Sequence, residues 1–416
     1  VWVDREPRWS VQARGGVPFH PCRQAAVRGH RAGAVTVLGS ATPSLASELA
    51  VREQRIDRLT LPERARASAV LPRVELIDLR RVGAGPTGHR LLSLPLHRAI
   101  EQTLEARGQI ILFLNRRGFA PSLLCEACGK VVECPSCAVA LTLHRHGRAR
   151  LSCHYCDHAV PLMERCPGCG SGRLSEEGAG TERIEQALSE AFPAGRIARL
   201  DRDVAAGAKS EKVLDRMRRR EIDILVGTQM VTKGHDLPDV TLVGVLNADA
   251  ALAMPDFRAA ERAFHLLVQV AGRAGRGDVP GKVLIQTWQP EHPAVALAAH
   301  HDVERFVVRE LEDRRELGYP PYRRMALVRV DSADEARARD AAERLAQIAR
   351  KSAGPRVDVL GPAPAPLPRL RNRYRFRFMV RSAERALMRP VLLAVARTAV
   401  DRAVRVVIDI DPVNML

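Results

Sequence analysis

Eight of the nine cysteines lie within residues 125–169, where they form four Cys-x-x-Cys pairs. A gap of two residues lets both thiolates of a pair face one ion, and two pairs complete a tetrahedral set of four sulfurs. We therefore expect two zinc sites, and a structural role for both, because four thiolates leave no open position for water. The pairs are Cys125/Cys128, Cys134/Cys137, Cys153/Cys156 and Cys166/Cys169.

A disulfide framework is the competing interpretation of these cysteines. Such frameworks are typical of small secreted domains, whereas the rest of this chain contains only Cys22. No segment approaches the roughly 18 to 20 apolar residues needed to cross a bilayer, and no basic-then-apolar leader is visible. We expect a soluble, cytoplasmic and nucleoid-associated protein with reduced thiols.

The chain carries an excess of positive charge. Its 416 residues include 65 basic and 48 acidic side chains, which give a net charge of +17. This excess favours a polyanionic partner, above all nucleic acid. An arginine-rich genome explains the same count, so charge alone leaves both explanations open.

Short apolar runs recur along the first three quarters of the chain, and each ends in small or polar residues. Continuous Val, Ile and Leu runs separated by helical stretches predict strands that are buried on both faces of a parallel sheet. Ligands of such sheets bind beyond the carboxyl ends of the strands. We therefore expect an α/β nucleotide-binding fold with an inserted cysteine module. The runs are 35–38, 110–114, 222–226, 240–246 and 283–285.

The pattern changes after about residue 320. Strands are predicted at 325–330, 357–360, 374–380 and 404–410, and helices at 333–351 and 384–400. The resulting β-α-β-β-α-β order is typical of a ferredoxin-like sandwich. The proline-rich segment 361–368 is predicted to be a stiff connection between its two halves.

Two further segments have the composition of phosphate-binding motifs. Residues 269–276 read Gln-Val-Ala-Gly-Arg-Ala-Gly-Arg, which we interpret as a helix start whose arginines approach a triphosphate bidentately. The alternative is a helix C-terminus with solvated arginines. Residues 226–236 follow a strand and are predicted to contact a nucleic-acid backbone and a nucleotide. The alternative for this segment is a glycine-containing turn with exposed polar side chains.

These pieces together resemble a family of superfamily 2 DNA helicases that act in replication restart, the primosomal protein N′ (PriA) family. Ser40-Ala-Thr resembles helicase motif III, and Asn115-Arg-Arg-Gly-Phe opens the second RecA-like lobe. Segments 180–182, 227–236 and 269–276 resemble the later motifs in order. Segments 255–259, 317–322, 360–364 and 408–412 also match the family.

The resemblance implies roles for individual residues. The nucleotide would contact Gly234, Asp236, Gln269, Arg273 and Arg276. Arg273 and Arg276 would also assist catalysis, and Asp4 would be the magnesium ligand. Thr228, Gln229 and Lys233 would contact DNA. Spacing alone does not choose among cysteine pairings, but the family implies one zinc ion on the outer pairs, 125/128 and 166/169. The second ion would lie on the inner pairs, 134/137 and 153/156.

The implied function is ATP-driven 3′-to-5′ DNA unwinding at branched or stalled forks, with reloading of the replicative helicase. Its cofactors would be two zinc ions, with ATP and Mg²⁺ as the substrate pair. Its partners would be branched and single-stranded DNA, single-strand-binding protein, and primosome and helicase-loading proteins. The expected domains are a lobe-one remnant (1–50), lobe two (51–124 and 174–300), the zinc insert (125–173) and the C-terminal domain (301–416).

Two features depart from the family pattern. The chain contains no Gly-Lys-Thr or Gly-Lys-Ser P-loop. Arg5 and Pro7 stand at the Glu and His positions of the Asp-Glu-x-His box, and a cation cannot position the attacking water as a carboxylate does. Two explanations stay open: a shifted register that places Glu6 at the Glu position, and a P-loop that lies upstream of Val1. The alternative function is a helicase-inactive platform that binds DNA and loads the primosome.

The arginines between residues 369 and 377 alternate with aromatic residues. On one strand, Arg369, Arg371, Arg373, Arg375 and Arg377 would share a face, with the aromatic side chains on the other. We interpret this face as a site for DNA or for an acidic peptide tail. A solvated basic face over a buried aromatic face is the alternative.

Overall fold

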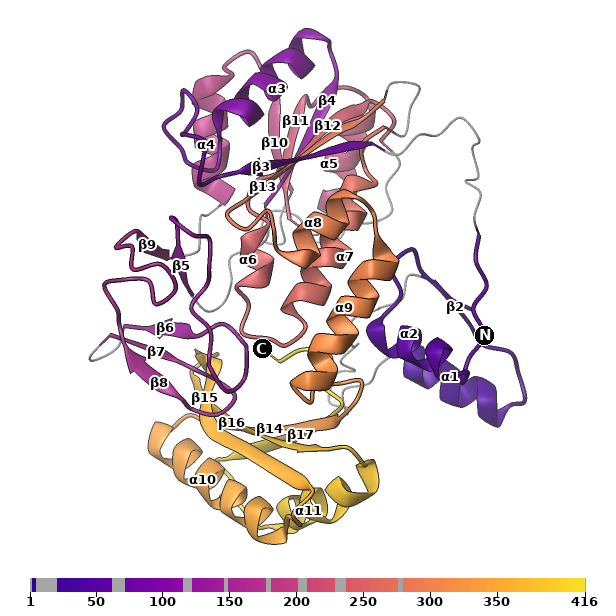
Figure 1. Ribbon diagram of the computed structural model, residues 1–416, viewed down its shortest axis with the longest axis vertical. Coiled ribbons are helices and arrows are strands. Elements are labelled where there is room, and N and C mark those ends of the chain that lie inside the picture. The colour runs from indigo at the N-terminus through magenta and orange to yellow at the C-terminus, as the bar shows by residue number, and fades with distance from the viewer. Residues whose placement is uncertain are drawn as a thin grey trace.

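The computed structural model describes residues 2–4, 21–61, 72–114, 122–145, 149–176, 181–200, 208–228, 237–275 and 280–415. Figure 1 shows a lobe built around a sheet at the top, a C-terminal domain at the bottom, and a cysteine-rich module between them on the left. A small N-terminal unit lies on the right, beside α9. Within the described ranges, no helix combines the length and apolar character that crossing a bilayer requires.

The lobe is built on a six-stranded sheet with the order β10-β11-β4-β12-β13-β3, in which all neighbouring strands run parallel. Its strands are β3 (Arg73–Asp78), β4 (Gln109–Phe113), β10 (Ile197–Leu200), β11 (Ile224–Gly227), β12 (Val240–Val245) and β13 (Lys282–Thr287). The predictions at 110–114, 222–226, 240–246 and 283–285 are confirmed.

Helices cover both faces of this sheet, as the continuous apolar runs predict. Alternate side chains of β4 enter opposite cores, with Ile111 on one side and Ile110 on the other. The first core is closed by α5 (Ala208–Arg218), α7 (Ala259–Ala271) and α8 (Pro293–Ala299). The second is closed by α3 (Leu94–Glu105) and α4 (Thr181–Ala191). The short helix α6 (Asp249–Leu252) follows β12.

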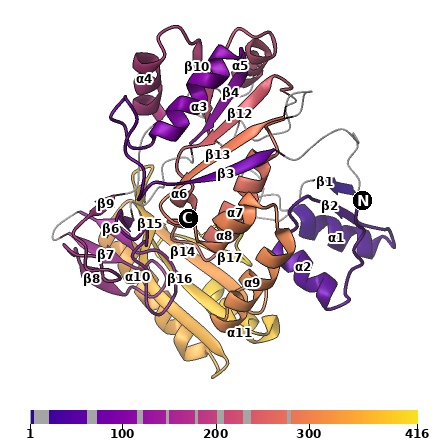
Figure 2. The ribbon, with the colours of Figure 1, turned by 45° about the horizontal axis from the view of Figure 1, so that its top comes forward.

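The N-terminal unit contains a two-stranded parallel sheet and two helices. Strand β1 (Trp2–Asp4) pairs with β2 (Val37–Gly39), and the helices are α1 (Pro21–Arg31) and α2 (Leu45–Arg52). Leu45 and Leu49 of α2 pack against Val307 and Leu311 of α9 (Val303–Glu316). Figure 2 shows the unit beside α9, away from the six-stranded sheet. Apolar packing on α9 therefore attaches this unit to the rest of the chain.

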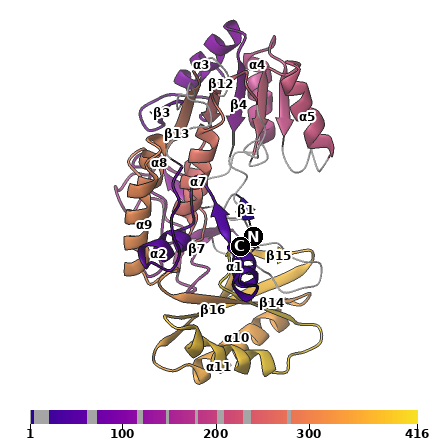
Figure 3. The same ribbon diagram turned by 90° about the vertical axis from the view of Figure 1, so that its right-hand side faces the viewer.

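The C-terminal domain has the predicted β-α-β-β-α-β order, and its antiparallel sheet has the order β15-β16-β14-β17. Both helices cover one face of the sheet, where they share a core with its strands. Figure 3 shows that this face points away from the six-stranded lobe. The elements are β14 (Arg324–Ser332), α10 (Glu335–Ser352), β15 (Val357–Leu370), β16 (Arg373–Ser382), α11 (Arg385–Arg397) and β17 (Arg405–Ile410).

The prediction of a proline-rich connection at 361–368 is wrong. These residues belong to β15, which runs on to Leu370 and pairs with β16 with two register shifts, after Leu360 and after Pro364. Strand β15 lies at the edge of the sheet, and an edge strand tolerates proline because half of its backbone groups need no partner strand. The segment is therefore structural sheet rather than linker.

The prediction of one arginine face between 369 and 377 is also wrong. Arg371 and Asn372 have φ values of 51° and 58° and form the turn between β15 and β16, so Arg369 lies on the preceding strand. Arg377 is 1% exposed. A fully buried guanidinium cannot bind DNA or an acidic peptide, whereas Phe376 and Phe378 do face the helical core, as predicted.

A buried ion network joins α7 to α9. The guanidinium of Arg314 donates to Glu261 at 2.9 Å and to Glu310 at 3.0 Å, and it also reaches the Pro320 carbonyl at 3.1 Å. Burial alone would raise the pKa of Glu261, yet Arg314 holds it at about 2. Burial does raise the pKa of Glu310, to about 7. Glu261 additionally accepts the Leu45 N–H at 3.2 Å, so the network connects the N-terminal unit, the lobe and the start of the C-terminal domain.

We predict that Arg314→Met lowers the free energy of unfolding by roughly 3–5 kcal/mol, because it leaves the Glu261 carboxylate buried without its cation. Urea unfolding followed by fluorescence measures this change. Arg315→Met is the matched control, since Arg315 is the next residue of α9 and is exposed; it should change stability by less than about 1 kcal/mol. Equal effects of the two variants would contradict the role of the network.

Candidate functional site

The cysteine-rich module consists of two small antiparallel sheets. Strands β5 (Leu123–Cys125) and β9 (Leu174–Glu176) pair at its base, and β6 (Thr142–His144), β7 (Arg150–Ser152) and β8 (Ala159–Pro161) form the second sheet. Each strand has three residues. Strands this short bury little apolar surface, so the cysteine clusters must supply much of the cohesion.

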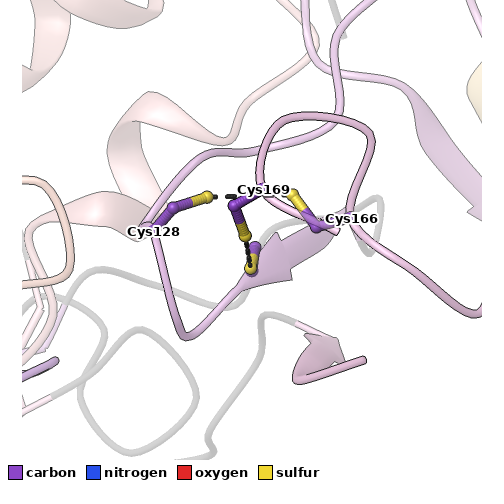
Figure 4. A group of neighbouring side chains, drawn as sticks. Cys128, Cys166 and Cys169 are labelled. Carbon is purple, nitrogen blue, oxygen red and sulfur yellow. Dashed lines mark hydrogen bonds between the residues drawn. The ribbon is translucent and has the colours of Figure 1, made fainter. Parts of the chain in front are cut away.

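The eight paired cysteines form two groups of four, and in each group all sulfur atoms lie within 4.8 Å of one another. The outer cluster is Cys125, Cys128, Cys166 and Cys169, and the inner cluster is Cys134, Cys137, Cys153 and Cys156. The outer and inner pairs therefore combine as the family resemblance implies. Figure 4 shows Cys128, Cys166 and Cys169 of the outer cluster with their sulfurs turned toward one another.

The sulfur spacing fits a tetrahedral zinc ion. Neighbouring Sγ atoms lie 3.6 Å apart for Cys125 and Cys169, 3.7 Å for Cys128 and Cys166, and 3.6 Å for Cys134 and Cys156. A regular tetrahedron with Zn–S bonds of about 2.3 Å has S–S edges of about 3.8 Å. None of the eight is in a disulfide. The chain has two structural zinc sites, each with four thiolates.

All four Cys-x-x-Cys turns adopt the same backbone conformation. In each turn, the carbonyl of the first cysteine accepts the N–H of the fourth residue after it, at 2.7 to 3.0 Å. That fourth residue has a positive φ, between 48° and 80°, in every turn. The four residues are Gly129, Ala138, Asp157 and Gly170. The glycines directly after the outer pairs are the sequence signal for this conformation, which the spacing of the cysteines alone does not reveal.

The crowded thiols already favour deprotonation at one position of the inner cluster. A hydrogen bond from Cys137 lowers the pKa of Cys153 to about 5, and the same bond raises the pKa of Cys137. Burial and the neighbouring thiols also raise the pKa of Cys134. A divalent cation needs all four thiols deprotonated, so zinc binding at this cluster releases protons.

The outer cluster rests on the six-stranded lobe. A Cβ atom on Gly129 would lie 2.0 Å from the carbonyl oxygen of Trp288, directly after β13. Arg80 donates to the Cys128 carbonyl at 3.4 Å and is held by Asp78 and Glu291, each at 2.8 Å. The outer zinc site is therefore fixed at the carboxyl edge of the lobe's sheet.

The inner cluster rests on the C-terminal domain and on the loop before α7. The Tyr319 hydroxyl donates to the Cys137 carbonyl at 2.7 Å, and the ring of Tyr319 stacks on Phe257 with centroids 4.9 Å apart. His154 lies 2.6 Å from the Pro364 carbonyl through Nδ1, and burial lowers its pKa to about 3, so Nδ1–H of a neutral ring donates. Inner-cluster residues, Met379 and Met415 share one apolar core.

The segment 255–259, matched to the family without a role, holds the C-terminal tail. The buried carboxylate of Asp256 accepts the Met415 N–H at 3.2 Å and pairs with Arg262 at 2.8 Å. Arg258 donates to the Pro412 carbonyl at 2.7 Å, and Arg262 donates to the Val413 carbonyl at 2.6 Å. The two family-like segments 255–259 and 408–412 are therefore brought together, although the contacting residues Arg258 and Pro412 lie 154 positions apart in sequence.

The nucleotide and DNA residues are described only in part. Gln229, Lys233, Gly234, Asp236 and Arg276 lie outside the described residues, and their roles stay predictions. Thr228 follows β11 at the carboxyl edge of the sheet, but it is only 5% exposed. Asp4 ends β1 and pairs with Gly39 of β2, directly before Ser40-Ala-Thr. The backbone of Asp4 therefore lies beside the start of that segment, and its role as a magnesium ligand stays a prediction.

The prediction of a helix start at 269–276 is wrong. Gln269 is exposed in the last turn of α7, and Gly272 caps the helix. Arg273 therefore follows a helix C-terminus, and Gly275 with φ of 68° donates to the Val240 carbonyl at the start of β12. Arg273 lies at the amino edge of the sheet, opposite Thr228. The structure therefore does not bring Arg273 and Thr228 together, in line with the separate roles predicted for them, at a nucleotide and at DNA.

We predict that Gly129→Ala weakens the outer zinc site more than Gly170→Ala does. Both glycines have positive φ, which costs an alanine about 1 kcal/mol or more, but a Cβ atom at Gly170 would meet nothing within 4 Å. Only Gly129→Ala also pushes the turn off the Trp288 carbonyl. Zinc release to a chromogenic chelator should be faster for Gly129→Ala, and equal rates would show that this contact carries no strain.

Comparisons with known proteins agree with this geometry. Three family models match: Helicase conserved C-terminal domain (179–278), PriA DNA helicase Cys-rich region domain (134–161) and Primosomal protein N C-terminal domain (315–413). Two relatives named replication restart protein PriA, from Bacillus subtilis and Treponema pallidum, are 38% and 40% identical over the whole chain. The chain spans 52% and 62% of their respective lengths. Along its whole length, the chain is therefore similar to replication restart protein PriA.

Proposed function

We propose that this chain forms the fork-binding and helicase-loading part of a replication restart protein. The observation that carries the proposal is the position of the two zinc clusters, one on the helicase lobe and one on the C-terminal domain. The module between them fixes the lobe and the domain in one orientation. A junction in branched DNA has several arms at defined angles, so a protein that grips it benefits from surfaces that keep a fixed relation.

In the proposed motor, this chain supplies one half of the ATP site. Arg273 and Arg276 stabilise charge on a transferred phosphoryl group, and Gln269, Gly234 and Asp236 contact the nucleotide. Asp4 holds Mg²⁺ at the edge of the lobe-one strands. These groups bind and orient a nucleotide, but hydrolysis also needs a P-loop and a carboxylate that positions water. In the complete helicase, this site drives 3′-to-5′ unwinding of the lagging arm.

The positive charge of the chain supports contact with nucleic acid. Arg389 and Arg397 of α11 and Arg402 after it are exposed, and within the described residues no carboxylate lies within 4.0 Å of any of them. Gln229 and Lys233 are the proposed DNA contacts in the lobe, whereas the burial of Thr228 limits it to shaping the segment. Single-strand-binding protein and primosome loaders are the proposed protein partners, at the nucleoid in the cytoplasm.

Binding to a synthetic fork tests the DNA part of this proposal. We predict that affinity falls steeply with salt, because phosphate contacts release counterions. Lys233→Ala should weaken binding to forks of any sequence and reduce the salt slope by about 1. Lys212→Ala, an exposed lysine of α5, is the matched control and should bind as the parent does. Binding that ignores salt, or equal loss in both variants, would overturn the proposed contact.

ATP hydrolysis by the purified full-length protein with forked DNA tests the motor. With Glu6 as the carboxylate that positions water, we predict stimulated hydrolysis that Arg273→Ala and Arg276→Ala each abolish. Arg219→Ala, at an exposed position after α5, should leave it intact. If the protein binds the fork but does not hydrolyse ATP, the motor proposal is wrong, and the protein acts as a loading platform. If hydrolysis persists in both variants, neither arginine belongs to the ATP site.

A further inference from the structure

One buried cation in the C-terminal domain has only neutral hydrogen-bond partners. Arg377 lies on β16, on the sheet face opposite α10 and α11, and is 1% exposed. Its Nε donates to the His154 carbonyl at 3.1 Å, and another nitrogen of the group donates to the Met415 carbonyl. The guanidinium also lies over the ring of Tyr155, 5.6 Å from its centroid.

Such a charge needs an anion, because transfer of an ion from water into a protein interior is costly unless the ion is paired. Across the described residues, no carboxylate lies within 4.0 Å of Arg377. Asp256 lies nearby, but it is already shared with Arg262 at 2.8 Å and with the Arg258 N–H at 3.0 Å. Asp256 is therefore not a dedicated partner of Arg377.

The inner zinc cluster carries the missing negative charge. A zinc ion with four thiolates has a net charge of about −2, from one divalent cation and four monovalent anions. The carbonyl that Arg377 binds belongs to His154, the residue directly after Cys153 in the inner turn. Burial lowers the pKa of Arg377 to about 10, and the nearby Tyr155, Asp256 and Cys153 oppose that effect.

The outer cluster has no equivalent requirement. Its Cys169 is exposed, so water screens the charge of that cluster directly. Three of the four inner cysteines are buried, and only Cys156 is partly exposed. Arg80 beside the outer cluster is also paired with Asp78 and Glu291, whereas Arg377 beside the inner cluster has no carboxylate within 4.0 Å among the described residues.

We infer that Arg377 is the counter-charge of the inner zinc–thiolate cluster, and that zinc occupancy of this cluster and docking of the C-terminal domain are one linked equilibrium. Arg377 lies on the sheet of the C-terminal domain and binds the C-terminal tail. Its attraction to the inner cluster therefore acts across the contact between this domain and the zinc module. Linkage is reciprocal: zinc strengthens docking of the domain by the same factor by which docking strengthens binding of zinc.

Release of the two zinc ions to a chromogenic chelator tests the role of the charge. Arg377→Gln keeps hydrogen-bond donors without charge, and Arg377→Lys keeps charge with fewer donors. We expect Arg377→Gln to release one of the two ions about 10- to 100-fold faster, a typical effect for a group behind metal ligands. Arg377→Lys should remain near the parent. Arg375→Gln, at a half-buried position on the same face, is the control and should release both ions normally.

The reverse pattern would overturn the inference. If Arg377→Lys loses zinc as fast as Arg377→Gln does, the hydrogen bonds and not the charge hold the site. If both retain two ions at the parental rates, Arg377 has no role in zinc binding.

A second measurement does not depend on the folding of any Arg377 variant. Cys156→Ser removes a ligand of the inner cluster, and Cys169→Ser removes the equivalent ligand of the outer cluster. We expect hydrogen exchange of β16 and of residues 411–415 to rise at least tenfold in Cys156→Ser and to stay at the parental rate in Cys169→Ser. Unchanged exchange in Cys156→Ser, or an equal rise in both variants, would overturn the linkage.

Discussion

The arrangement of the whole chain depends on one buried junction around Asp256 and Phe257. Asp256 binds the backbone of the C-terminal tail, the Phe257 N–H binds the Tyr155 hydroxyl of the inner turn at 3.2 Å, and the Phe257 ring stacks on Tyr319. Arg258 and Arg314 lie over the same ring, 4.3 and 5.0 Å from its centroid. The lobe, the zinc module and the C-terminal domain all meet at this junction.

This junction combines apolar contact with buried charge. The apolar part supplies most of the stabilisation, since burial of aromatic rings is worth several kcal/mol. The ionic part is expensive to bury and is stabilising only while every member keeps its partner. It therefore selects one orientation of the lobe, the zinc module and the C-terminal domain, because other orientations would leave a carboxylate or a guanidinium unpaired.

The sequence predicts what depends on local spacing. The cysteine pairs, the buried strands from 110 to 285 and the C-terminal strand–helix order all follow from regular spacing, and the structure confirms them. Two predictions failed because they depend on distant partners. Residues 361–368 form an edge strand because β16 pairs with them, and Arg377 is buried because the zinc module covers it. The predicted helix start at 269–276 failed for a local reason, because α7 ends at Ala271 and Gly272 caps it. The contacts of Phe257 and Tyr319 have no local signal at all.

Helix α7 has a mechanical consequence for this architecture. Its thirteen residues span about 20 Å at a rise of about 1.5 Å per residue, with Arg258 and Glu261 anchored at one end and Arg273 just beyond the other. The backbone of Gly275 meets Gly281 so closely that a methyl group on either would overlap it. Phe264 stacks on Phe306 along the way, with centroids 3.9 Å apart. Because α7 is packed at both ends and along its length, its Arg273 end cannot tilt without displacing the C-terminal residues held at its other end. The orientation of Arg273 and the position of the last residues of the chain are therefore coupled.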